Sequence, residues 1–269
     1  MDLKRVTSAL LGFPMVIVVL LFGNKYIIDI VLAIVAIISL HEYYNAFNSK
    51  YKTIQWIGYL LAASISLIHF IPSEQLFGFI GISMPIVIVL FFVQLIIKNL
   101  EISIIDIAIS LFGILYIVLF IMFIPLLAGT ANGKILIWYA IFAAWGTDLT
   151  AYIIGKTFKL GKHKFSKISP NKSIEGCIAG LIGAIAISLL FTICINKFLS
   201  VEISYIKVLI ISAVLSIIGQ FGDFAASSIK RFNEIKDFSN LIPGHGGLLD
   251  RIDSLIFIAP FAYILLILM

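Results

Sequence analysis

The chain has 269 residues, of which 61% are hydrophobic and only 12% are charged, with a net charge of +5 and a mean hydropathy of +1.13. So few charged side chains cannot cover a globule of this size with a hydrated surface, which excludes the class of soluble proteins. The sequence therefore predicts an all-α integral membrane protein with a single transmembrane domain over residues 1–269.

Apolar runs long enough to cross roughly 30 Å of hydrocarbon recur along almost the whole chain. We interpret them as a polytopic bundle of about nine transmembrane helices. They cover residues 5–22, 26–47, 54–71, 76–97, 102–124, 135–155, 174–195, 205–229 and 252–269. The first is expected to be retained, because its apolar part is too long for a signal peptide and no cleavage-site pattern follows it. Pro125 and Gly129 follow the fifth, so the segment up to Gly133 is either a loop or a re-entrant segment.

The basic residues predict the orientation of the bundle. If the N-terminus is cytoplasmic, all but four of the 19 Lys and Arg residues fall on cytoplasmic segments, the four being Lys25, Lys134, Lys197 and Lys207. Cytoplasmic loops retain Lys and Arg, so this asymmetry supports both the span count and a cytoplasmic N-terminus. The positive charge of that face suits an anionic membrane surface or a phosphorylated substrate, and nucleic acid is not expected as a partner.

Two cysteines, two histidines and one aspartate are expected to have structural and not catalytic roles. Cys177 and Cys194 are predicted to lie in one span, too far apart along the helix for a disulfide, and to serve in packing. His41 and His69 are expected to be ordinary interfacial or packing histidines. Asp29, near the outer end of the second span, is expected to be solvated or hydrogen-bonded there.

Carboxylates inside apolar spans are the first candidates for chemistry. An Asp at the centre of a span costs about 2.5 to 3.5 kcal/mol, so such residues are usually functional or paired. The clearest cases are Asp148 in AAWGTDLTAYIIGK and Asp223 in SIIGQFGDFAASSIKR. One helix face there carries polar residues, which are Gln220, Asp223, Ser227 and Lys230. This face should meet protein or water, and Gly219 and Gly222 would let another helix or a ligand come close. The alternative is a polar seam that only joins helices.

The most polar stretch of the chain is SIKRFNEIKDFSNLIPGHGGLLDRID, residues 228–253. Asp250 and Asp253 are spaced i, i+3, so both project from one face at the start of the last span. Helix capping is the alternative role for them. The preceding PGHGG can turn tightly and present backbone amides to a phosphate. Carboxylates and phosphate oxygens together hold Mg²⁺, and nearby basic side chains can neutralise phosphate charge. These basic side chains are Lys230, Arg231, Lys236 and Arg251. The combination predicts a metal-assisted phosphate site at a membrane face.

The loop GKTFKLGKHKFSKISPNKSIEG, residues 155–176, adds further lysines and a histidine on the same side. A solvated loop attracted to lipid headgroups is the alternative interpretation for Lys159, Lys162 and Lys164. The GKT at its start is not a P-loop, because Thr150 stands where the first glycine is required and no strand precedes it.

Residues 227–253 resemble the signature of the phosphatidate cytidylyltransferases, or CDP-diacylglycerol synthases. The matching elements are Ser, Lys-Arg, Lys-Asp, Pro-x-His-Gly-Gly and Asp-Arg-x-Asp. The resemblance also covers GTDLTAYIIGK, SPNKSIEG and GQFGDFAASSIKR, so the catalytic signature occupies residues 148–253 in the C-terminal half. In the N-terminal half only HEYY at residues 41–44 matches, where Glu42 sits like an acidic-aromatic pair found early in the family.

The resemblance implies Mg²⁺-dependent transfer of CMP from CTP to phosphatidate in the cell membrane, giving CDP-diacylglycerol and pyrophosphate for phospholipid biosynthesis. It places the active site on the cytoplasmic side and is compatible with a homodimer and with a second cation. The implied catalytic residues are Asp223, Lys230, Arg231, Asp250 and Arg251. The implied metal ligands are Asp223, Asp250 and Asp253. The implied substrate contacts are Asp148, Ser169, Lys172, Ser227, Lys236, His245, Gly246 and Gly247.

Two alternatives stay open. One is a related enzyme acting on another lipid, such as an isoprenoid-ether phosphatidate, or a CTP-dependent lipid kinase. The other is an ion transporter, because Asp148 and Asp223 also suit a cation path. Transport is disfavoured because the charge is concentrated on one face and the two halves have no matching pair of Gly/Pro-broken spans. Without an anchored nucleophile, direct displacement is favoured over a covalent enzyme intermediate.

Overall fold

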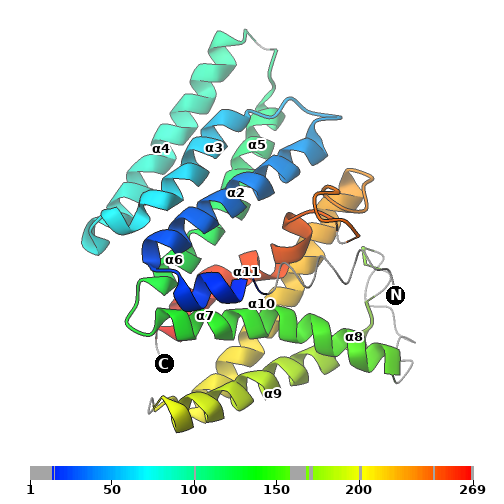
Figure 1. Ribbon diagram of the computed structural model, residues 1–269. Coiled ribbons are helices and arrows are strands. Elements are labelled where there is room, and N and C mark those ends of the chain that lie inside the picture. Colours follow the sequence, from blue (N-terminus) through cyan, green and yellow to red (C-terminus); the bar gives the residue numbers. More distant parts are fainter. Residues whose placement is uncertain are drawn as a thin grey trace. The chain divides into compact units, whose positions relative to one another are not determined.

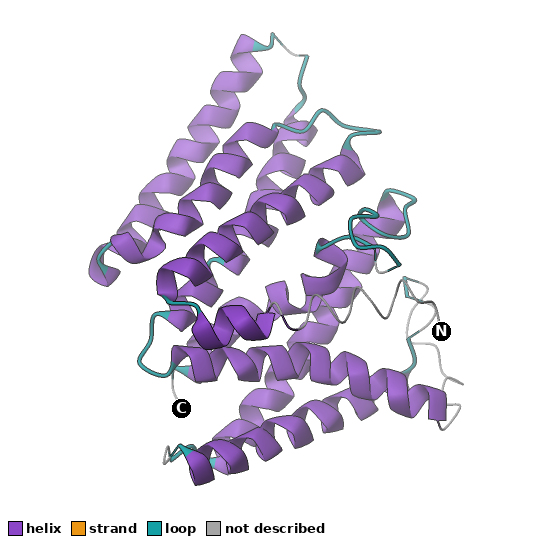
Figure 2. Cartoon of the chain, viewed as in Figure 1, coloured by secondary structure: helices purple, strands orange, loops and turns teal. Residues whose placement is uncertain are grey.

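Helices make up most of the protein in the computed structural model, which describes residues 14, 16–99, 101–157, 168–169, 172–199, 202–244 and 246–267 (Figure 1). Figure 2 shows only helices and loops, and no β-strand occurs in these ranges. The all-α prediction is therefore confirmed for this part of the chain. Among the described residues, six helical runs are long and apolar enough to cross a membrane. They are Lys25–Phe47, Glu74–Ile97, Ile104–Ala128, Gly133–Thr157, Ile174–Phe198 and Tyr205–Phe232.

Three of the predicted spans differ from these six. The third is a shorter element, because α3 (Gln55–Ser64) continues as a 3₁₀-helix, η1 (Ile65–Phe70). The last, α11 (Leu249–Leu266), has the length of a span but carries three charged residues near its start. The first predicted span lies largely outside the described residues. Its described part includes residues 16–22, which are helical.

The fifth predicted span extends further than expected. It begins with α5 (Ile104–Gly113), passes through the π-helix η2 (Ile114–Leu119) and ends with α6 (Phe123–Ala128). Pro125 lies inside α6, and a short turn at residues 129–132 follows it. The segment up to Gly133, expected to be a loop or a re-entrant segment, is therefore the last turns of a helix followed by a short turn.

The chain divides into two compact units. The first contains Met1–Gly129 and Ile235–Arg251, and the second contains Thr130–Glu234 and Ile252–Met269. The first three residues of α11 thus belong to the first unit and the rest of the helix to the second.

In the first unit, α2 (Lys25–Phe47), α3, α4 (Ser73–Ile97) and α5 run alongside one another (Figure 1). The contact between α2 and α5 is built on two buried tyrosines. Tyr43 and Tyr44 donate their hydroxyl groups to the carbonyl oxygens of Ile109 and Ser110, each at 3.2 Å. A Cβ at Gly113 would lie 2.7 Å from the Tyr43 ring, so glycine is what allows the two helices to pack this closely. The two tyrosines of the HEYY motif are therefore core residues.

Asp29 and His69 form a buried pair in the same unit. The Asp29 carboxylate is fully buried and accepts hydrogen bonds from Nδ1 of His69 at 2.7 and 2.9 Å. The expectation that Asp29 is hydrogen-bonded is confirmed, and the expectation that it is solvated is wrong. His69 is more than a packing residue, because a carboxylate in an apolar environment needs a partner and this histidine supplies it.

The second unit begins with an unbroken helical run, α7 (Gly133–Ile141), the π-helix η3 (Phe142–Gly146) and α8 (Thr147–Thr157). It continues with α9 (Ile174–Phe198) and α10 (Tyr205–Phe232).

Small side chains bring these helices of the second unit together. A Cβ at Gly180 of α9 would lie 2.8 Å from Thr147 of α8, and the Thr147 hydroxyl lies 2.7 Å from that of Ser216 in α10. Cys177 and Cys194 both lie in α9 as free thiols, as predicted.

Candidate active site

Two glycines allow α10 and α11 to pack closely in the second unit. A Cβ at Gly219 would lie 2.8 Å from Ile258, and one at Gly222 would lie 2.7 Å from Phe257 and 2.8 Å from the carbonyl oxygen of Asp253. Real Cβ atoms essentially never approach other atoms this closely. The prediction that these glycines admit another helix is therefore confirmed, and that helix is α11.

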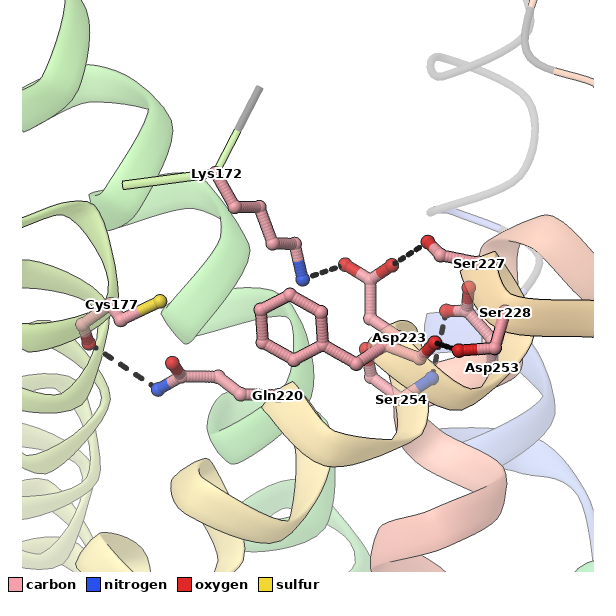
Figure 3. Close-up of polar contacts among 9 residues, drawn as sticks. Lys172, Cys177, Gln220, Asp223, Ser227, Ser228, Asp253 and Ser254 are labelled. Atoms are coloured by element: carbon pink, nitrogen blue, oxygen red, sulfur yellow. Dashed lines mark hydrogen bonds and ion pairs between the residues drawn. The ribbon is translucent and has the colours of Figure 1, made fainter. Parts of the chain in front are cut away.

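The Asp223 carboxylate lies on this face of α10, between a lysine and a serine (Figure 3). Its Oδ2 forms an ion pair with Nζ of Lys172, and its Oδ1 accepts a hydrogen bond from Ser227 at 3.4 Å. Nζ of Lys172 also lies 4.6 Å from the centre of the Phe224 ring, a distance at which the ring face attracts a cation. Both partners of Lys172 come from consecutive residues of α10, so the ammonium group is held at one point above this helix.

Asp253 is a second acid in the same region. Its side chain is buried, and its Oδ1 accepts a hydrogen bond from the backbone N–H of Ser254 at 2.8 Å. Its charge interacts with those of Asp223, Asp148 and Lys230. We call the residues Asp148, Lys172, Asp223, Lys230 and Asp253 the carboxylate cluster. Carboxylates this close disfavour one another's ionised forms, so a bound cation, in addition to the two lysines, would stabilise them.

The polar stripe of α10 faces protein, as predicted, at three of its positions. Gln220 donates to the carbonyl oxygen of Cys177 in α9 at 3.3 Å, Asp223 pairs with Lys172, and Ser227 is buried. The stripe therefore joins helices and also carries a member of the carboxylate cluster.

The donor atoms of the cluster fit a hard divalent cation. Asp223 and Asp253 offer only oxygen, and Mg²⁺ commonly binds one or two protein carboxylates together with phosphate oxygens and water. Within the described ranges, no three His, Cys, Asp or Glu side chains converge on one point as a complete protein cage would require. The arrangement therefore fits an ion shared with a phosphate group better than a structural zinc site.

The signature loop, residues 235–248, lies in the first unit and turns tightly at two glycines. Gly244 and Gly246 have φ angles of +79° and +84°, a region that side-chain-bearing residues rarely adopt. The backbone N–H of Ile242 donates to the carbonyl oxygen of Gly246 at 2.8 Å and closes the turn. His245 lies outside the described residues.

Asp250 holds this loop with one of its carboxylate oxygens. Its Oδ2 accepts hydrogen bonds from the backbone N–H groups of Phe238 at 2.8 Å and Gly247 at 3.0 Å. The loop-holding role resembles the capping alternative for Asp250. It also means that the Gly247 amide, expected to face a phosphate, is directed at a carboxylate in this structure.

Glu42 holds the same loop from α2. Its carboxylate accepts three hydrogen bonds, from the hydroxyl of Ser239 and from the backbone N–H groups of Leu248 and Leu249. In the sequence, Glu42 is marked only by its likeness to a family position. The signal in the sequence that could have revealed its partners is the strongly apolar run around it, where an acid needs buried donors.

The other predicted site residues are distributed between the units. The second unit contains Asp148, Ser169, Lys172, Asp223, Ser227, Lys230, Arg231 and Asp253, and the first contains Lys236, Gly246, Gly247, Asp250 and Arg251. Lys230 is half-buried at the end of α10, whereas Arg231, Lys236 and Arg251 are exposed. Asp148 is the second residue of α8, the helix that follows the π-helix η3. The carbonyl oxygen of Ser169 accepts a hydrogen bond from the backbone N–H of Lys172 at 3.1 Å.

Comparison with known proteins assigns the chain to a family. The model of the cytidylyltransferase family matches residues 3–269. A phosphatidate cytidylyltransferase of Staphylococcus haemolyticus is 33% identical over 269 residues, which cover 98% of each chain. One of Staphylococcus saprophyticus is 33% identical over 267 residues, again 98% of each chain. One of Bacillus subtilis is 43% identical over 135 residues, which cover 50% of this chain and 48% of that protein. The chain therefore belongs to the cytidylyltransferase family and is a nucleotidyltransferase, as the resemblance of its charged segment predicted.

Proposed function

We propose that the protein transfers CMP from CTP to phosphatidate, giving CDP-diacylglycerol and pyrophosphate. An oxygen of the phosphatidate phosphate attacks the α-phosphorus of CTP, a new P–O bond forms, and the bond to the β-phosphate breaks as pyrophosphate leaves. The family and the names of its relatives support the reaction class and both substrates. The observation that carries the proposal is the carboxylate cluster, which combines buried acid and lysine within an apolar domain.

The carboxylate cluster suits the charge changes of this reaction. When bound, Mg²⁺ polarises the α-phosphate and stabilises the charge of the departing pyrophosphate. Asp223 and Asp253 are the proposed ligands, since both lie on the faces of α10 and α11 that Gly222 brings together. We also propose Asp250 as a ligand, because its i, i+3 spacing from Asp253 in the sequence places it on the same face of α11. The protein contributes mainly by positioning its substrates and neutralising charge.

Basic side chains are proposed to bind the phosphate groups. Lys172 reaches the Asp223 carboxylate, so it is placed to contact an oxygen of a phosphate bound beside that acid. Lys230 belongs to the same cluster, and Arg231 and Arg251 are exposed. We place this chemistry at the cytoplasmic face because most Lys and Arg residues are predicted to lie there.

The test is to incubate purified protein with phosphatidate, Mg²⁺ and CTP labelled at either the α- or the γ-phosphorus. Cytidylyl transfer moves the α label into the lipid phase and leaves the γ label in water as pyrophosphate. A γ label in the lipid would instead identify a CTP-dependent lipid kinase. Absence of both labels from the lipid would refute the proposal.

A further inference from the structure

Glu42 is a buried acid whose hydrogen-bond partners all come from one distant segment. Its side chain is only 3% exposed. Oε1 accepts hydrogen bonds from the Ser239 hydroxyl at 2.5 Å and the Leu248 N–H at 2.9 Å, and Oε2 accepts one from the Leu249 N–H at 2.7 Å. A buried carboxylate must be compensated by donors, and these three supply the compensation.

Two of these donors are backbone groups at the start of α11. The first N–H groups of a helix have no partner within the helix, and they form the positive end of its dipole. Glu42 satisfies two of them from another helix, α2, and so fixes where α11 begins.

The glycine before α11 gives independent support for this arrangement. A Cβ at Gly247 would lie 2.7 and 2.8 Å from the two carboxylate oxygens of Glu42 and 2.9 Å from its Cδ. The last glycine of PGHGG is therefore required by the close approach of Glu42. The Gly247 N–H is bonded in turn to Asp250, so the loop is held between two carboxylates.

We propose that Glu42 is a positioning residue for the reaction. It holds the signature loop and the start of α11, and thereby sets the positions of Asp250 and Arg251. This role rests on the proposed function, in which those two residues serve. Glu42 acts through the loop and not on the substrates, because both of its oxygens already accept hydrogen bonds, from the loop and from the start of α11.

The test compares Glu42→Gln with Glu101→Gln, which makes the same change at an exposed position in the same unit. An amide keeps one acceptor but turns an NH₂ group toward backbone donors, so the loop should loosen. We expect faster hydrogen exchange in peptides covering residues 237–249, a kcat about 10 to 100-fold lower, and a smaller change in the KM for CTP. Glu101→Gln should match the wild type in all three measurements.

Three outcomes would overturn the proposal. A wild-type kcat in Glu42→Gln would leave Glu42 a purely structural residue, whatever the exchange rates. A reduced kcat with unchanged exchange in the loop would mean that Glu42 acts directly in the reaction. A fall in the amount of folded protein without a fall in kcat per folded molecule would again indicate stability alone.

A second variant covers the case in which Glu42→Gln does not fold. Ser239→Ala removes one of the three hydrogen bonds and leaves the two to the backbone, so we expect a smaller change in the same direction in both exchange and kcat. No change in either would refute the proposal. The exchange measurement needs no substrate, so it remains decisive even if the wild type fails to make CDP-diacylglycerol, a result that would refute the proposed reaction instead.

Discussion

The contact between Gly247 and Glu42 leads to a prediction for Gly247→Ala, a substitution that adds a single methyl group. The added Cβ would lie 2.7 Å from Oε2 of Glu42, against an ordinary contact distance of 3.4 Å or more, so the carboxylate or the loop must move by about 0.7 Å. Such a shift would stretch the 2.7 Å hydrogen bond to Leu249 beyond the normal range. Loss of one charged hydrogen bond and local overpacking should together cost about 2 to 4 kcal/mol of stability.

The activity of Gly247→Ala should fall by about 10 to 100-fold, because small displacements of positioning groups reduce the fraction of productive complexes. The assay is the initial rate of CDP-diacylglycerol formation from CTP and phosphatidate, with thermal unfolding measured on the same detergent-solubilised sample. Gly81→Ala is the matched control, since a Cβ there would have no neighbour within 4 Å. If the two variants have the same rate and the same Tm, Glu42 does not lie against the loop and the reasoning is wrong.

Four further predictions concern the metal, two acids and the topology. Asp250→Asn removes a charge but keeps a carbonyl that can accept from the two loop amides, so it should fold normally and lose at least about a hundredfold in turnover. Near wild-type turnover at saturating Mg²⁺ would leave loop holding as its role. Asp29→Asn should lower stability by about 1 to 3 kcal/mol, because it removes the charge from a buried hydrogen bond with His69, while kcat per folded molecule stays unchanged; an unaltered Tm would contradict the pairing. Activity should require Mg²⁺ or Mn²⁺ and not be supported by Zn²⁺ alone, and full turnover in excess EDTA would disprove this. Cysteines introduced at Lys236 and Lys197 should be labelled from opposite sides of the membrane, and labelling from one side would contradict the predicted orientation.

Features that depend on local spacing could be predicted from the sequence. The polar stripe of α10, its two interfacial glycines and the placement of both cysteines in one helix all follow from helical periodicity, and the structure confirms them. Charge patterning also draws attention to Asp148 and Asp223, because an apolar span rarely tolerates an aspartate without a reason. Asp253 stands out through its i, i+3 spacing from Asp250.

The partners of these acids could not be predicted. An isolated carboxylate in an apolar run indicates that a partner exists, but periodicity relates only residues within a few turns of one another. The partner of Asp29 is 40 residues away, and the partners of Glu42 are 197 to 207 residues away. The same limit explains why the sequence predicts a phosphate-facing turn at PGHGG, whereas in the structure Glu42 and Asp250 occupy the space beside its last glycine.

The long separation between Glu42 and its partners bears on how the protein is made. Ribosomes deliver the chain to the membrane from the N-terminus, so α2 is inserted long before residues 239–249 are synthesised. Until those residues arrive, Glu42 is a charge in an apolar helix without its native donors, and the N-terminal half must persist as an unfinished intermediate. Nascent chains that stop before the signature loop should consequently be recognised by membrane quality control, and maturation of this enzyme should be a late, post-insertion event.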